Sequence, residues 1–592
     1  MPYPIKYIEN NLVWNNEGEC FAYYELIPFN YSFLSLEQKD AVHDAFRQLI
    51  AQNRDGKIHA LQISTESSIC AAQERSKKSV TGRLKEIACA EIDEQTENLV
   101  ASLGDTQVDY RFFIGFKLVV TDKELSVKEV GNAAKNLLHD AVNAIGHSFM
   151  GDFVSMPNDE IRRYSRMEKL MENKLSRRFK VRRLDKNDFG YLLEHIYGRT
   201  GTAYEDFEFT LPLEKRKRDT LVKRYDLIKP ARCLIEEKQR YLHMKSEDSE
   251  SCVAYFTISD VVGELDFPSS EIFYYQEQQF DFAIDTSMNV EIITNKAALH
   301  TVRNKKKELK DLDNHAWENN SETTNQVAEA LDSVDELESV LDQSKESMYK
   351  LSYVVRVTAP DVEELKRRCN QVRDFYDDAS IKLVRPIGDM MGLHSEFIPA
   401  SKRYMNDYVQ YVTSDFLAGL GFGATQMLGE RDGIYLGYNV DTDQNVYVQP
   451  ARAAQGVKGS VTNALSGAFL GSLGGGKSLS FNLLTYYAVL NGAQALILDP
   501  KSERGQWKEK LPEIADEINI VNLTSDEENK GMLDPYIIMR KTKDAESLAL
   551  DVLTFLTGIS SRDGKLFPVL RRAVRAVTNS ETRGLLRVID AL

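Results

Sequence analysis

Hydrophobic residues recur along this chain with two periodicities, which predict different secondary-structure elements. Short runs in which apolar residues cluster or alternate favour β-strands, whereas apolar residues at i, i+3, i+4 and i+7 favour helices. The strand-like runs lie at 20–29, 57–65, 109–122, 251–260, 281–290 and 350–360. Helical stretches separate the first three runs, which predicts an α+β organisation for the N-terminal part of the chain.

In the middle of the chain, the hydrophobic residues have the periodicity of helices. We expect helices at 191–200 and 221–244, and another helix capped by Asp361. Between 295 and 345, two apolar stripes separated by the polar string ENNSETTN predict an antiparallel helical hairpin, whose seam packs within the chain or against a partner. The stripes contain Leu299, Val302, Leu309 and Leu312 in one arm and Val327, Leu331, Val334, Leu337 and Leu341 in the other.

The octet GSLGGGKS, Gly471 to Ser478, fits the phosphate-binding pattern G-x-x-x-x-G-K-S/T. In such a loop, backbone N–H groups surround the phosphates, and glycine permits the close approach and the positive φ angles. Lysine reaches the terminal phosphates, and the serine hydroxyl can bind magnesium. The predicted site for ATP and Mg²⁺ contains Gly471, Gly474, Gly475, Gly476, Lys477, Ser478 and Leu479, with Lys477 as the catalytic residue and Ser478 as the metal ligand.

The sequence around the octet predicts a βαβ unit. Ala468–Leu470 is a short apolar strand candidate, Leu479–Asn491 has the pattern of a helix, and Gly492 is typical of a helix stop. A second apolar run, Ala493–Pro500, would be the next parallel strand. The alternative is a glycine-rich turn with a surface lysine, which would need this flanking pattern to arise by chance.

Two acidic residues follow the second strand candidate. Asp499 and Glu503 would lie at the carboxyl edge of the sheet, where open α/β sheets bind their ligands. The pattern fits equally well an acidic turn that ends a strand ahead of Pro500.

Composition limits the other possibilities. The chain has 592 residues, too many for one core, and its 42% hydrophobic and 28% charged residues are typical of a soluble globular protein. No uncharged apolar run approaches 18 residues, the start MPYPIKYIENN has no signal-peptide pattern, and the six cysteines lack C-x-x-C spacing. We therefore expect a cytoplasmic protein without a membrane span or a zinc site.

One segment departs from the acidic average, which is a net charge of −16. Residues 161–186 contain 11 Lys or Arg and 3 acids, a local balance of 11 − 3 = +8. Ile161, Tyr164, Met167, Met171 and Leu175 recur at helical spacing, which predicts an amphipathic helix with a basic outer face. That face is either simply solvated or a contact for an acidic membrane, an acidic protein or nucleic acid.

The chain resembles the large VirB-four ATPases of type IV secretion and conjugation machines, in the form carried by conjugative elements of Gram-positive bacteria. The resemblance rests on Gly471–Trp507, on DGIYLGYN at 432–439 and on the order of segments ahead of them. It implies a RecA-like motor related to the HerA and FtsK translocases, assembled as a hexamer. It also implies a location at the cytoplasmic face of the membrane, with the N-terminal region against membrane and channel proteins.

The resemblance completes the expected architecture, a multidomain α/β and α+β chain in which an N-terminal α+β region precedes a RecA-like P-loop ATPase domain. We expect an α+β domain at 1–155, a second α+β unit with the basic helix at 156–290, the helical hairpin and an α+β connection at 291–406, and the ATPase domain at 407–592. The family match extends residue by residue to Gly471, Gly476, Lys477, Ser478, Asp499 and Glu503, and departs from the family at Leu473.

A second acidic motif, four apolar residues followed by Asp-Glu, is expected in RecA-like ATPases and is not found. The nearest string, 585–592, reads better as a helix, and only 592 − 477 = 115 residues follow Lys477. We therefore expect the motor to be incomplete at its C-terminus and to turn over ATP poorly. The rival functions are a DNA translocase, which the acidic charge disfavours, and a non-catalytic scaffold that retains half a motor.

Overall fold

The computed structural model of the protein describes residues 3–53, 56–104, 106–119, 158–198, 207–209, 221–227, 231–246, 249–261, 267–318, 325–403, 405–442, 444–452, 454, 466–523 and 530–592. The chain forms two compact units, Met1–Ala495 and Leu496–Leu592. The boundary expected near 155 and most of the polar link in the helical hairpin, 319–324, lie outside the described residues.

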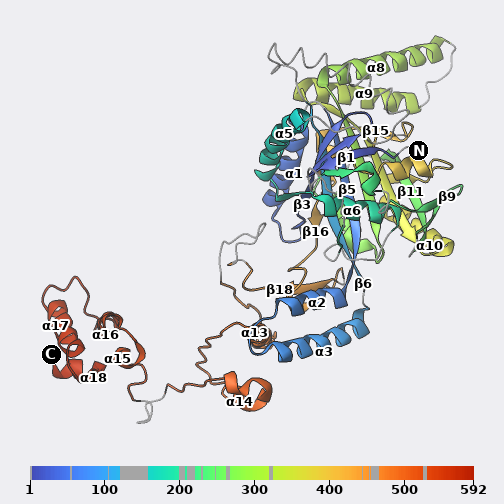
Figure 1. The fold of residues 1–592 in the computed structure, drawn as a ribbon. Coiled ribbons are helices and arrows are strands. Elements are labelled where there is room, and N and C mark those ends of the chain that lie inside the picture. Colours follow the sequence, from blue (N-terminus) through green and yellow to red (C-terminus); the bar gives the residue numbers. More distant parts are fainter. Residues whose placement is uncertain are drawn as a thin grey trace. The chain divides into compact units, whose positions relative to one another are not determined.

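One antiparallel sheet forms the centre of the first unit (Figure 1). Its strands are paired in the order β8-β1-β2-β3-β6-β5-β12-β13-β11-β10-β9, and β7, β14 and β15 pair with β3, β11 and β13. The bounds are β1 Ile5–Glu9, β2 Leu12–Asn15, β3 Cys20–Leu26, β5 Lys57–Ser68, β6 Thr106–Lys117, β7 Val181–Arg183, β8 Leu221–Lys223, β9 Leu234–Glu237, β10 Leu242–Lys245, β11 Glu250–Val261, β12 Ile284–Ile293, β13 Met348–Ala359, β14 Ile381–Val384 and β15 Val409–Val412. The three segments expected as separate domains up to residue 406 thus share one sheet.

The sheet contains the same βαββαβ arrangement twice. The first copy is β3, α1 (Leu36–Ala51), β5, β6, α5 (Asn158–Ser176) and β7, and the second is β11, α7 (Ile272–Gln279), β12, β13, α10 (Val362–Asp378) and β14. Their strand orders, β7-β3-β6-β5 and β14-β11-β13-β12, correspond, and the connectivity is that of ferredoxin-like units. The copies join where β5 pairs with β12.

Each copy carries a helical hairpin between its second and third strands. The first hairpin is α2 (Ile69–Ser79) with α3 (Lys85–Leu103), and the second is α8 (Asn295–Glu318) with α9 (Asn325–Ser344). The second confirms the predicted hairpin, whose seam buries Leu299, Val302 and Leu341. Leu312, expected in that seam, is 52% exposed.

Helices cover both faces of the sheet, which explains why β3 is buried at every position. On one face α1, α5, α7 and α10 contribute Phe46, Leu175, Phe273 and Leu365. On the other face α6 (Lys186–Tyr197) and α11 (Met390–Ser395) contribute Leu193 and Leu393. The apolar side of α5 packs as its sequence predicts, since Ile161 and Leu175 are buried.

The helix predicted at 221–244 is wrong. This segment forms β8, β9 and β10 instead, and β10 pairs with both β9 and β11. In β10, the buried Leu242 and Met244 alternate with the more exposed His243 and Lys245, which is the two-residue period of a strand. Pro230 also opposes a continuous helix, because it has no backbone N–H to donate. The six strand-like runs are confirmed as β3, β5, β6, β11, β12 and β13.

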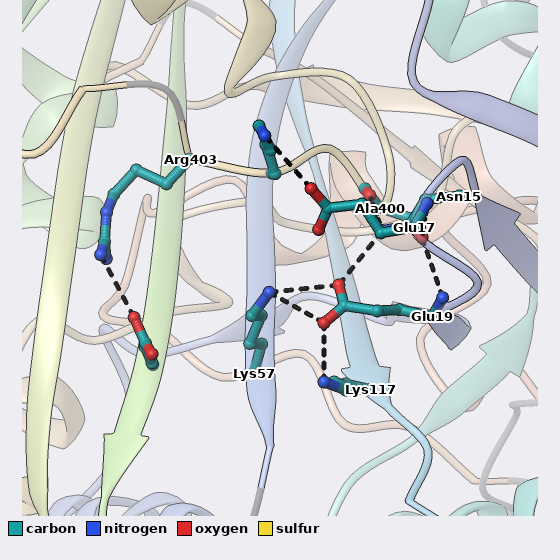
Figure 2. A network of polar contacts seen from close by, with 9 residues as sticks. Asn15, Glu17, Glu19, Lys57, Lys117, Ala400 and Arg403 are labelled. Atoms are coloured by element: carbon teal, nitrogen blue, oxygen red, sulfur yellow. Dashed lines mark hydrogen bonds and ion pairs between the residues drawn. The ribbon is translucent and has the colours of Figure 1, made fainter.

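A polar network ties the start of β3 to the segment that follows α11 (Figure 2). The Glu19 carboxylate accepts hydrogen bonds from Lys57 at 3.0 Å and from Lys117 at 2.7 Å. The Asn15 amide donates to Glu19 and to the Ala400 carbonyl, each at 3.1 Å. Burial opposes ionisation of Glu19, but the two lysines prevail and lower its pKa.

The second unit is helical in its described part. It contains α14 (Trp507–Lys510), α15 (Pro535–Ile538), α16 (Thr542–Thr557), α17 (Leu566–Thr578) and α18 (Leu585–Asp590). Ala549, Leu570, Val574 and Val588 form its small core. The helix expected near 585–592 is confirmed as α18.

Candidate nucleotide site

The P-loop octet lies on the surface of the first unit and runs directly into α13 (Lys477–Leu490). This helix confirms the one predicted after the loop. Gly492 follows its end with a φ of +98°, as expected of a glycine that stops a helix.

The two strands predicted beside this helix are wrong. Neither 468–470 nor 493–500 has regular secondary structure, and no described strand pairs with them. Leu470 and Leu496 are each 90% exposed. An apolar run supplies only strand propensity, whereas a strand forms where neighbours accept and donate its backbone hydrogen bonds. The predicted βαβ unit and its RecA-like parallel sheet are therefore absent from the described residues.

The glycines of the loop have separate physical roles. Gly474 and Gly476 have φ angles of +81° and +76°, in the left-handed region that residues with a Cβ rarely adopt. A Cβ at Gly475 would lie 3.2 Å from the Ser472 carbonyl oxygen, which accepts a hydrogen bond from the Gly475 N–H at 3.1 Å. At Gly471 it would lie 3.4 Å from Cγ of Lys477. The loop thus has the tight path that the motif predicts.

Lys477 folds back over this loop. Its ammonium group donates a hydrogen bond to the Ser472 carbonyl oxygen at 2.6 Å, so the charge lies above the backbone turn. The sequence could not predict that the Ser472 carbonyl accepts this hydrogen bond. Every residue has a backbone carbonyl, and its ability to accept does not depend on the side chain.

Ser478 and Leu479 lie in the first turn of α13, and both are exposed. The N–H groups of a first helical turn have no acceptor within the helix, and the N-cap Gly476 has no side chain to offer one. These donors and the positive end of the helix dipole favour an anion at this position. Ser478 lies in the same first turn, so its hydroxyl would be able to bind a metal ion held by a phosphate at this position.

Asp499 and Glu503 belong to the second unit. The Asp499 carboxylate accepts the Arg504 N–H at 2.8 Å and the Lys501 N–H at 3.3 Å, and it pairs with the Arg504 guanidinium at 3.4 Å. Glu503 is exposed. Asp499 therefore stabilises its own turn, and its carboxylate keeps lone pairs for a further partner.

The residues of the octet fit a nucleotide phosphate with magnesium. The fit rests on the two left-handed glycines, on the position of Gly475 where a Cβ would crowd Ser472, and on the open helix terminus beside Lys477. Backbone N–H groups and one ammonium provide donors, and one hydroxyl provides an oxygen ligand for a hard cation.

Comparison with known proteins supports this assignment at the level of the domain. Residues 444–592 match the family described as "AAA-like domain", so the C-terminal part of the chain carries such a domain. The match contains the P-loop and begins later than the boundary expected at 407. A Bacillus subtilis (strain 168) protein described as "Uncharacterized protein YddE" is 20% identical over 576 residues, which cover 92% of this chain and 67% of that protein.

The helices of the described residues include none that is both long and apolar enough to cross a membrane.

Proposed function

We propose that this protein is an ATP-binding motor subunit that energises a conjugative-transfer or type IV secretion machine at the cytoplasmic membrane. The observation that carries the proposal is the P-loop at the N-terminus of α13, within the range that matches the AAA-like domain. A long α+β region and a helical hairpin ahead of the P-loop support the same assignment.

We propose a role for each site residue from its position. Bound MgATP supplies the phosphoanhydride bond and a divalent charge that polarises it. The backbone N–H groups from Gly474 to Leu479 would surround the phosphates, and Lys477, whose ammonium group donates to the Ser472 carbonyl, would bind a terminal phosphate oxygen. Ser478 would hold the metal ion through its hydroxyl. Asp499 and Glu503 are candidate acids by the family resemblance alone.

The α8–α9 hairpin is the proposed contact for channel proteins. Cross-helix ion pairs stabilise it, including Arg303 with Glu338 at 2.7 Å and Lys306 with Asp335 at 2.8 Å. It leaves Leu312 52% exposed, and its connection to the sheet is confined to the ends of β12 and β13. A hairpin attached in this way can bind a partner without disturbing the sheet.

The outer face of α5 is the proposed contact for anionic lipid. Its two described acids, Glu168 and Glu172, face Arg183 at 2.8 Å and 2.6 Å. The exposed side chains of α5 include the basic Arg166 and Lys169 and the apolar Leu170, beside neutral polar ones such as Asn173. A basic surface with an apolar side chain suits the headgroup region of an acidic membrane. Assembly as a hexamer completes the proposal, by analogy with related motors.

One pair of measurements on the purified chain tests the function. Calorimetric titration with MgATP should show saturable binding, and a steady-state assay should show hydrolysis that depends on magnesium. Filter binding to single- and double-stranded DNA across a salt series should show only weak retention. Tight DNA binding with a steep salt slope would instead identify a DNA translocase. Absence of MgATP binding would favour the alternative function, a non-catalytic scaffold.

A further inference from the structure

The α2–α3 hairpin stands at the end of a two-stranded ribbon. β5 and β6 pair with each other from Ile58 and Phe116 to Ser68 and Thr106. The sheet supports only part of this length, because β12 pairs with 57–62 of β5 and β3 pairs with 112–117 of β6. The remaining residues, 63–68 and 106–111, form an arm that carries α2 and α3 beyond the sheet (Figure 1).

The P-loop helix rests on this arm. α13 contacts α3, and the two lie side by side in Figure 1. At its C-terminal end, a Cβ added to Gly492 would lie 2.6 Å from the Thr81 carbonyl oxygen, and one added to Gly82 would lie 3.5 Å from the Gly492 Cα. Gly492 therefore serves a close approach between α13 and the turn that joins α2 to α3, besides ending the helix.

Residues near the C-terminal end of α13 are also shielded from solvent. Leu490 is 1% exposed. Burial raises the pKa of Tyr487 in α13, and the carboxylates Glu91 and Glu94 of α3 raise it further.

A short hairpin joins the same assembly from the other side. β17 (Ile434–Tyr438) contacts α13 and pairs with β18 (Asn445–Val448). The Gly433 N–H, just before β17, donates to the buried Ser76 hydroxyl of α2 at 2.8 Å. The arm, the hairpin and α13 thus form one packed group.

We propose that the α2–α3 arm is a positioning element of the nucleotide site, holding α13 by its C-terminal end so that ATP binding and arm docking are coupled. The proposal rests on the proposed ATP-binding function. A helix of 14 residues spans about 21 Å and moves as a rigid rod, so the held end fixes the direction from which its first N–H groups meet the phosphates. Coupling of this kind is reciprocal, since each event favours the other equally. A partner that displaces the arm would weaken ATP binding.

Glycine substitutions on the two sides of the contact test the proposal in the full chain. Gly492→Ala places a methyl group against Thr81, and Gly82→Val places a side chain against Gly492 while leaving the sequence of α13 intact. Gly104→Ala and Gly104→Val are the matched controls. Gly104 also caps a helix, α3, with a positive φ of +78°, but a Cβ there meets nothing within 4 Å.

The expected results distinguish a failure of the proposed arm contact from a failure of the proposed ATP-binding function. Both contact variants should weaken MgATP binding about 5-fold or more, within the usual range of coupling, and the controls should change it less than about 2-fold. Hydrogen exchange should show that MgATP slows exchange at 471–478 and also at 69–103 in the wild type and the controls, but not at 69–103 in the contact variants. Protection of the P-loop without any change in the arm would overturn the proposal.

A nucleotide-free measurement still decides the arm if the wild type binds no MgATP, which would end the proposed function. In that case α13 should exchange faster in Gly492→Ala and Gly82→Val than in the Gly104 variants. Equal exchange in all four variants would show that the arm does not hold α13.

Discussion

The ammonium group of Lys477 donates a hydrogen bond to the carbonyl oxygen of Ser472, at 2.6 Å across the P-loop. The lysine is thus already held over the turn by the backbone before any phosphate is bound. In the proposed function, ATP binding would exchange this neutral acceptor for a charged phosphate oxygen, and hydrogen bonds to charged groups contribute about 1.5 to 3 kcal/mol.

Lys477→Ala should therefore weaken MgATP binding roughly 10- to 150-fold in a calorimetric titration. Lys382→Ala, at a lysine whose side chain is 58% exposed and which lies on the distant strand β14, is the control and should leave affinity unchanged. Equal affinity of the Lys477 variant and the wild type would show that the loop does not bind phosphate.

Ser478→Ala should weaken nucleotide binding only when magnesium is present, because the lost group is a metal ligand and the backbone donors remain. The comparison is ATP affinity with Mg²⁺ and with EDTA. Ser480→Ala is the control two positions along the same helix, where the N–H already donates to Gly476 at 2.9 Å. A loss of equal size with and without the ion would rule out the metal role.

Arg356 is 1% exposed, and its guanidinium pairs with Asp285 at 3.1 Å and donates to the backbone carbonyls of His195 and Ile196. Arg356→Met should reduce the free energy of unfolding by about 3 to 5 kcal/mol, because it removes the guanidinium from the buried Asp285 carboxylate and leaves it with His195 and Ser64 as partners. Urea unfolding measures the change. Arg303→Met removes one partner of an exposed ion pair and should have a much smaller effect.

Burial raises the pKa of Glu396 to about 7, although Ser352 and Asn289 donate hydrogen bonds to it. Since the unfolded value is about 4.3, the folded state binds the proton more tightly. This carboxyl contributes stability that is complete below about pH 4.3 and is lost as the pH rises to about 7. Glu396→Gln should remove this loss, on the order of 2 kcal/mol between pH 5 and 7.

Ser352→Ala provides the opposite change for the same profile. It removes a donor that lowers the pKa of Glu396, so the decline with pH should become steeper and extend higher. Urea unfolding at several pH values compares the three proteins. Identical slopes in all of them would mean that Glu396 does not titrate in this range.

Deletion of 295–345 should abolish co-purification with channel components and leave MgATP affinity intact. The deletion is feasible because Ile293 of β12 and Met348 of β13 are already paired, so a short turn can replace the hairpin. A circular dichroism melt checks that the sheet persists. If the shortened chain is folded and still binds the channel, the hairpin is not the contact surface.

The octet itself determined the loop conformation, because glycine at 474 and 476 can adopt positive φ angles that residues with a Cβ rarely adopt. Local periodicity likewise predicted α13, the α8–α9 hairpin and the six principal strands. These features depend on residues close together in the sequence, which is why they can be predicted from it.

Tertiary structure alone decided how these elements combine. The helix expected at 221–244 became strands because β1 and β11 offered partners, and the runs at 468–470 and 493–500 formed no strands because no described strand pairs with them. The duplicated βαββαβ arrangement and the approach of Gly492 to Thr81 join segments hundreds of residues apart. Backbone hydrogen bonds and close packing between such segments depend on which surfaces meet in the folded chain. A local sequence pattern does not specify which distant segment it will pair with.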